Sequence, residues 1–172
     1  SDSGQFEDIS LQQGIRQILY PYEEMEVLNP EWEVILKDII DSLFEQMSDE
    51  EYNILNEEFG TYMVSRAYEY RQLLEYLVFR YFAKSIYDYD FLGKCQMLVT
   101  NFFVIRQMDI IRWLDNHREY SFKDRMDVVH IFSRQVEYSE DNIENLYEDF
   151  IFDDIFKTDS LIAILWIDSE NI

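Results

Sequence analysis

Two arginines, Arg80 and Arg106, lie inside stretches of sequence that are otherwise apolar. Arg80 stands between "LVF" and "YF", and Arg106 stands between "NFFVI" and "QMDII". In a helix such stretches are apolar almost all the way round, and a guanidinium is costly to bury there without partners. It stays protonated and cannot act as a base, but it binds carboxylates and phosphates well. The two arginines are therefore the first candidates for a binding site.

The helical neighbours of Arg80 indicate what such a site would contain. Tyr76 and Lys84 lie four residues before and after it, so a phenol and a second cation share its face. If this helix packs antiparallel to the helix of Arg106, both arginines face one polar pocket that can hold a carboxylate or a phosphate. In the alternative interpretation, each arginine lies along the helix surface with its head in water or paired with an acid such as Asp109.

A third candidate group lies in the stretch "HIFSRQVEYS". His130, Arg134 and Glu137 follow at steps of four and three residues, which places them on one stripe of a helix. Such a stripe could line a site in which the histidine titrates near neutral pH and the Arg–Glu pair holds it in place. It is equally typical of an exposed face covered with ion pairs. The opposite side of this helix carries an apolar stripe, made of Phe122, Met126, Val129, Phe132 and Val136.

No familiar catalytic motif accompanies these residues. The chain has no glycine-rich phosphate loop, no nucleophile elbow and no HExxH metal motif. It has 1 cysteine, Cys95, and 2 histidines that are far apart in sequence, so no metal site is expected. Carboxylates are too numerous for a catalytic pair to be chosen among them. The catalytic residues are therefore unassigned.

The charge of the chain limits its possible partners. Its 36 acidic and 14 basic residues give a formal net charge of −22. Such a surface repels phosphate backbones and anionic lipids and attracts basic partners, so neither nucleic acid nor a membrane is expected. The longest apolar run, Met97 to Ile105, is also shorter than the roughly 18 residues of a membrane span. A solvated acidic surface that serves only solubility is the simpler explanation of the charge.

Helices must position the candidate residues, because the sequence lacks the turn residues of a β fold. Only 4 glycines and 2 prolines occur in 172 residues, too few for repeated hairpins. Capping residues mark several helix starts, namely Asn29 with Pro30, Ser48, Asp90, Ser121 and Ser139. Gly60 is expected to end a helix with a positive φ. The predicted helices cover roughly residues 29–47, 48–60, 63–87, 91–114, 121–137, 139–150 and 158–167.

These elements predict an all-α fold, a single helical-bundle domain of six to eight helices. Residues 1–28 are predicted to form an N-terminal helix, with an apolar periodicity that stops at Pro21, and a connector. Residues 29–172 are predicted to form the helical domain itself. Neither an internal repeat nor a low-complexity linker divides the chain further.

Three segments of the second half, "EYLVFRYFAKSIYDYD", "FLGKCQMLVTNFFVIRQMDIIRWL" and "FKDRMDVVHIFSRQVEYSEDNIENL", carry a distinctive set of residues. The set consists of Tyr76, Arg80, Tyr81, Phe82, Lys84, Tyr87, Asp88, Asp90, Arg106, His130, Ser133, Arg134, Glu137, Tyr138, Ser139 and Asn142. In order and spacing, these segments resemble the C-terminal half of the flagellin lysine-N-methylase family. The resemblance covers about Glu69 to Phe150, and the preceding helices resemble the family more loosely.

The resemblance implies a bacterial, cytoplasmic enzyme that methylates lysine side chains of flagellin with S-adenosylmethionine as the methyl donor. Members of the family also carry a cysteine cluster near their N-terminus that is suited to an iron–sulfur centre. That cysteine-rich part is absent here. Either this chain is the C-terminal part of a longer methyltransferase or it has lost that part, and in both cases we do not expect it to be active alone.

Together these observations predict a helical domain of a flagellin lysine methyltransferase that contributes substrate recognition or part of the donor pocket. Its expected partner is flagellin or another basic, lysine-bearing protein. One alternative is a non-catalytic acidic interaction module that binds a basic protein, and another is a ligand-binding sensor domain with an enclosed apolar pocket. The candidate binding residues are Tyr76, Arg80, Lys84, Arg106, His130, Arg134 and Glu137.

Overall fold

The computed structural model describes residues 9–82 and 90–170, and these residues form an all-α fold without strands. The predicted fold class is confirmed. No described helix is both long and apolar enough to cross a membrane. The α-helices are α1 (Leu11–Glu23), α2 (Pro30–Ile39), α3 (Asp49–Met63), α4 (Ala67–Phe82), α5 (Phe91–Asp115), α6 (Phe122–Phe132), α7 (Glu140–Phe152) and α8 (Thr158–Glu170). Short 3₁₀ turns are η2 (Val64–Arg66) and η5 (Asp154–Phe156).

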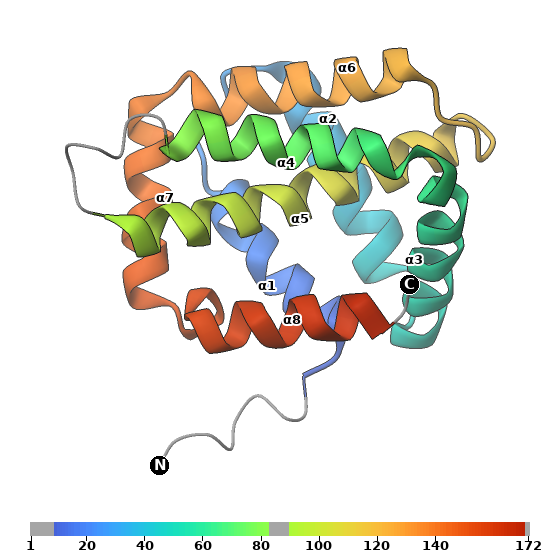
Figure 1. Ribbon diagram of the computed structural model, residues 1–172, viewed down its shortest axis with the longest axis horizontal. Helices are drawn as coiled ribbons and strands as arrows, with labels where there is room; N and C mark the ends of the chain where they lie inside the picture. The colour runs from blue at the N-terminus through green and yellow to red at the C-terminus, as the bar shows by residue number, and fades with distance from the viewer. Residues whose placement is uncertain (1–8, 83–89, 171–172) are drawn as a thin grey trace.

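Helix α5 lies at the centre of the domain (Figure 1). It contacts α1, α2, α4, α6, α7 and α8. From Phe103 to Ile111 every side chain is buried, whichever side of the helix it occupies. A helix that is apolar nearly all round is therefore surrounded by its neighbours, as its sequence requires.

Polar side chains of α5 are buried as well, and tyrosines from the surrounding helices satisfy them. The hydroxyl of Tyr22 donates to Oδ1 of Asn101 at 2.6 Å, and Nδ2 of Asn101 donates to the hydroxyl of Tyr81 at 2.7 Å. Tyr52 donates to Oε1 of Gln107 at 2.9 Å. Each such bond contributes about 1 kcal/mol net, and leaving a buried partner unpaired would cost more. Several of the 13 tyrosines thus have a structural role.

The predicted helix starts are confirmed by their capping contacts. Ser48 and Glu51 form a reciprocal capping box before α3, and Ser121 and Asp124 form another before α6. Asn29 accepts from the backbone N–H of Glu31, with Pro30 as the first residue of α2. Asp90 and Ser139 cap α5 and α7 in the same way. Local sequence alone therefore places the beginnings of these helices.

Two predicted helix ends are wrong. Helix α3 continues through Gly60 to Met63, and no described glycine has a positive φ. Asn56, Phe59 and Met63 are buried on either side of Gly60, and this packing outweighs the roughly 1 kcal/mol by which glycine disfavours a helix. Helix α1 likewise runs past Pro21 to Glu23, with Tyr22 completely buried.

Two helices that were predicted to be continuous contain π-helical turns. These are η1 (Ile40–Glu45), which follows α2, and η4 (Ser133–Glu137), which follows α6. In η4 the backbone N–H of Tyr138 donates to the carbonyl of Ser133 at 3.2 Å, five residues back. A π turn accommodates one extra residue and so rotates everything after it relative to the preceding helix. This rotation changes which residues of the "HIFSRQVEYS" segment share a face.

Candidate functional site

Tyr76, Arg80 and Glu137 converge where α4 passes η4. The hydroxyl of Tyr76 donates to Oε2 of Glu137 at 2.6 Å, and Nη2 of Arg80 donates to the main-chain oxygen of Glu137 at 3.1 Å. Nε of Arg80 lies 4.0 Å from the Glu137 carboxylate, and 32% of the arginine side chain is exposed. Most of the side chain is therefore buried and faces an acid, but its hydrogen bond goes to the carbonyl.

The Glu137 carboxylate is the centre of a wider hydroxyl network. Besides Tyr76, it accepts from the Tyr81 hydroxyl at 3.0 Å and from the Ser133 hydroxyl at 2.8 Å. Only 2% of its side chain is exposed. Burial and the neighbouring carboxylate both raise the pKa of Tyr76 and of Tyr81, so both phenols remain protonated donors. The network ties α4 to η4 and, through the Tyr81–Asn101 bond, to α5.

The predicted stripe of His130, Arg134 and Glu137 does not exist as one face. His130 and Arg134 are exposed, whereas Glu137 is buried. The reason is η4, because one extra residue in the turn moves Glu137 about 100° around the helix axis from its α-helical position. Glu137 therefore belongs with Tyr76 and Arg80, and His130 and Arg134 belong to a different surface.

The shared pocket that was one of the two interpretations of Arg80 and Arg106 is not formed. Arg106 is buried and donates from Nε and Nη2 to Oδ1 of Asn56 on α3, at 3.3 and 3.1 Å, with its guanidinium 5.8 Å from the centre of the Phe59 ring. Arg80 instead contacts Glu137. Helices α4 and α5 do pack together, but their arginines point to different partners. Lys84 lies outside the described residues.

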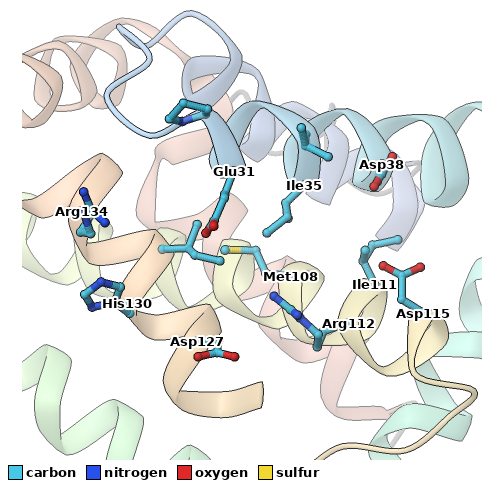
Figure 2. Close-up of a pocket in the computed structure, with 13 residues that line it drawn as sticks. Glu31, Ile35, Asp38, Met108, Ile111, Arg112, Asp115, Asp127, His130 and Arg134 are labelled. Atoms are coloured by element: carbon cyan, nitrogen blue, oxygen red, sulfur yellow. The ribbon is translucent and has the colours of Figure 1, made fainter. Parts of the chain in front are cut away.

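His130 and Arg134 line a groove between α2, α5 and α6, with a volume of about 810 Å³. Figure 2 shows them side by side at one end of it, with Asp38 and Asp115 at the other. We call this surface the acidic groove. Its apolar side chains are Val34, Ile35, Met108, Ile111 and Ile131, and its charged ones are Glu31, Asp38, Asp115, Asp127, Arg112 and Arg134.

Carboxylates outnumber cations around the acidic groove. Four acids and two arginines line it, so carboxylates exceed guanidinium groups by two. Asp38 and Asp115 are exposed at its edge, where a partner can contact both carboxylates from solution. Charged edges around an apolar floor suit an amphipathic basic segment, because apolar contacts supply affinity and opposite charges set orientation and association rate.

A buried charge cluster between α4, α5 and α6 was not predicted. Arg125 donates from Nη1 to Oδ2 of Asp109 at 2.5 Å, and the hydroxyls of Tyr70 and Tyr120 donate to the same carboxylate. Glu69, 2% exposed, lies in ion-pair range of Arg125 and receives a hydrogen bond from Arg66. Burial raises the pKa of Asp109, an effect that its three donors counteract.

The spacing of these residues was a usable signal. Glu69, Leu73, Leu77 and Tyr81 recur at steps of four, and all four are buried on one face of α4. Arg125 likewise shares the buried face of α6 with Val128 and Phe132. Charged residues in phase with a helix's apolar residues therefore predict a buried ion pair, here between Arg125 and Glu69.

Comparison with known proteins identifies a family. A family model described as the FliB lysine N-methylase C-terminal domain matches residues 4–164. The match extends well before Glu69, includes every described candidate residue and confirms the resemblance drawn from the motifs. No curated protein and no solved structure matches the chain. Within the described part of the chain, no three His, Cys, Asp or Glu side chains cluster as ligands for a metal ion.

Proposed function

The chain belongs to the FliB lysine N-methylase C-terminal domain family, and from this premise we propose that it recognises the lysine-bearing surface of flagellin for a methyltransferase that uses S-adenosylmethionine. The observation that carries the proposal is the acidic groove, which combines an apolar floor with an excess of carboxylates. The net charge of −22 adds long-range attraction for a basic surface and speeds association at low salt. As a cytoplasmic flagellin partner, the domain would meet flagellin before export.

The chemistry of lysine methylation limits what the acidic groove can do. The nucleophile must be the neutral amine, and nearby carboxylates stabilise the ammonium form instead. A lysine held among Asp38 and Asp115 would therefore be a poor methyl acceptor. We assign to the groove the docking of basic residues near the target lysine, not the reaction itself.

Neither the two embedded arginines nor the cysteine of this chain supports a step of methyl transfer. Arg80 and Arg106 contact Glu137 and Asn56 respectively, so they do not share one pocket for a carboxylate or a phosphate. Cys95 is the 1 cysteine of the chain, and an iron–sulfur cluster needs several thiolates. The residues of this chain alone therefore do not fit such a cluster.

Binding of flagellin to groove variants tests the proposal. The double variant Asp38→Asn/Asp115→Asn removes two exposed carboxylates of the acidic groove, and Glu144→Asn/Glu148→Asn removes two exposed carboxylates of α7. Both variants change the net charge equally. At low salt we expect the groove variant to bind immobilised flagellin about tenfold more weakly and the control to change less than about threefold. Equal weakening of flagellin binding by both variants would mean that net charge alone explains the effect. It would contradict binding in the acidic groove.

Binding experiments can distinguish flagellin recognition from the alternative function, a general acidic interaction module. It is favoured by the open form of the groove and by the lack of a catalytic motif in the chain. A basic protein of similar net charge to the flagellin surface serves as the comparison ligand. If the domain is a general acidic module, both ligands should bind equally and with the same salt dependence. If it recognises flagellin, the preference for flagellin over the comparison protein should persist at about 0.3 M salt, where exposed charges are screened.

A further inference from the structure

Helix α4 exposes a broad apolar face. It packs against α5 on one side, and its other side lies on the outside of the domain (Figure 1). We call this exposed side the outer face of α4, and it consists of Tyr68, Arg71, Leu74, Glu75, Val78 and Phe79. All of these residues except Tyr68 line a hollow of about 460 Å³. A large apolar surface that remains exposed is typical of an interaction site.

The excess acidic charge of the chain is not carried by α4. Helices α3 and α7 each contain five acids and no lysine or arginine. Helix α4 contains two acids, Glu69 and Glu75, and two arginines, Arg71 and Arg80. A chain with a net charge of −22 repels a copy of itself wherever two acidic surfaces meet. A second copy can therefore approach the outer face of α4 with less repulsion than it meets at α3 or α7.

The charges of the outer face are complementary to a second copy of themselves. Arg71 and Glu75 form an ion pair of 2.9 Å, and their side chains are 80% and 62% exposed. In a twofold symmetric dimer the same surface of both copies is in contact. If the two α4 helices run antiparallel and the axis passes at the level of Leu73, Arg71 of each copy lies opposite Glu75 of the other. Each arginine then has a carboxylate in both copies.

The apolar residues of the outer face suit the same arrangement. The symmetry places Tyr68 opposite Val78 and the large Phe79 opposite the small, exposed Ala67, which lets two helices pack closely. Tyr68 and Phe79 are 55% and 74% exposed, which amounts to about 250 Å² at about 200 Å² per aromatic side chain. With its other four residues, the outer face offers on the order of 700 Å² per copy, close to the roughly 800 Å² of a standard interface.

We propose that the outer face of α4 is the interface of a homodimer in which two α4 helices pack antiparallel across a twofold axis. An interface at the lower end of the standard size range predicts a Kd on the order of 10 μM. The acidic groove lies on α2, α5 and α6 and is not part of this interface. The dimer therefore presents two acidic grooves to a partner.

Sedimentation equilibrium of the chain from about 1 to 200 μM tests the interface, because this range spans the expected Kd. We expect the mass to rise from monomer to dimer across it. Phe79→Ala removes the most exposed apolar residue of the outer face, and Phe152→Ala is the matched control, an aromatic residue of α7 that is 80% exposed. Both variants should keep the parent melting temperature. The dimer should weaken about tenfold in Phe79→Ala and less than about twofold in Phe152→Ala.

Charge exchange between positions 71 and 75 tests the antiparallel arrangement. Arg71→Glu and Glu75→Arg each place like charges opposite one another across the axis, so each should weaken the dimer about tenfold. The double variant Arg71→Glu/Glu75→Arg restores opposite charges and should dimerise like the parent. Net charge alone would give a different result, because Glu75→Arg makes the chain less acidic and would then strengthen the dimer.

Four results would overturn the inference. These are a monomer at every concentration, equal weakening by Phe79→Ala and Phe152→Ala, a stronger dimer in Glu75→Arg, or a double variant that stays as weak as the single ones. A monomer would leave the outer face of α4 to a different partner.

The inference and the proposed function fail separately. Added salt should strengthen the dimer, because it screens the repulsion between two acidic chains, whereas it should weaken the binding of flagellin. The Asp38→Asn/Asp115→Asn variant should dimerise like the parent, and the Phe79→Ala variant should bind monomeric flagellin like the parent.

Discussion

The contacts of Glu137 and Arg80 predict that the two partners contribute very unequally to stability. Replacing Glu137 by leucine removes an acceptor that binds the hydroxyls of Tyr76, Tyr81 and Ser133. Replacing Arg80 by leucine removes one hydrogen bond to a backbone carbonyl and a long contact of 4.0 Å. The same ion pair thus has a buried partner with several bonds and a partly exposed partner with one.

The expected magnitudes follow from the hydrogen bonds. Three bonds to a charged acceptor, at about 1.5 kcal/mol each, sum to about 4.5 kcal/mol. Tyr76 is 39% exposed and can bind water instead, and the new leucine buries apolar surface, so we expect about 3 kcal/mol for Glu137→Leu. One screened bond of Arg80 is worth at most about 1 kcal/mol, and leucine regains part of it.

Urea unfolding, followed by the fluorescence of the buried Trp32 and Trp113, measures both values. In a domain of this size about 3 kcal/mol lowers the melting temperature by roughly 6–12 °C. Glu144→Leu, at an exposed position of α7, is the control and should change stability by less than about 0.5 kcal/mol. If Arg80→Leu cost as much as Glu137→Leu, the hydroxyl network would not be the main source of the stabilisation and the reasoning would be refuted.

Two further predictions concern buried and capping acids. Asp109→Leu should cost at least about 3 kcal/mol in thermal unfolding, because it leaves Arg125 buried without its closest partner, whereas the exposed Asp115→Asn on the same helix should be nearly neutral. Partial burial raises the pKa of Asp124, but the hydrogen bonds from Ser121 outweigh this and leave it below its usual value. Its stabilisation is therefore complete above the unfolded pKa of about 4 and is lost as the pH falls through the lowered folded pKa. Asp124→Asn should cost about 1 kcal/mol at pH 7, and a difference that did not shrink with acidification would contradict this.

The sequence predicted the parts of the fold that depend on local contacts. The capping boxes at Ser48 and Ser121 involve residues three positions apart, so the helix starts could be placed without any knowledge of the tertiary structure. Gly60 was misjudged because its effect depends on how Phe59 and Met63 pack against the rest of the domain. Local propensity is worth about 1 kcal/mol at such a position, and tertiary packing outweighs it.

The candidate site was predicted in parts for a similar reason. Tyr76 and Arg80 were correctly associated, because they share a face of one helix. Glu137 was grouped with His130 and Arg134 because no local sequence pattern indicates the π turn at Ser133–Glu137. Arg106 bonds to Asn56, 50 residues away, and no spacing rule reaches across that separation. Sequence identified residues with unusual environments but could not pair them across helices.

Helix α6 carries a charge inward and part of its apolar surface outward. Arg125 is 5% exposed, whereas Phe122 and Met126 are 60% and 52% exposed. Folding alone favours the reverse, because burying apolar surface stabilises by about 25 cal/mol per Å². The inward arginine is explained by its ion pair with Asp109, whereas packing within the described residues does not explain the outward apolar side chains.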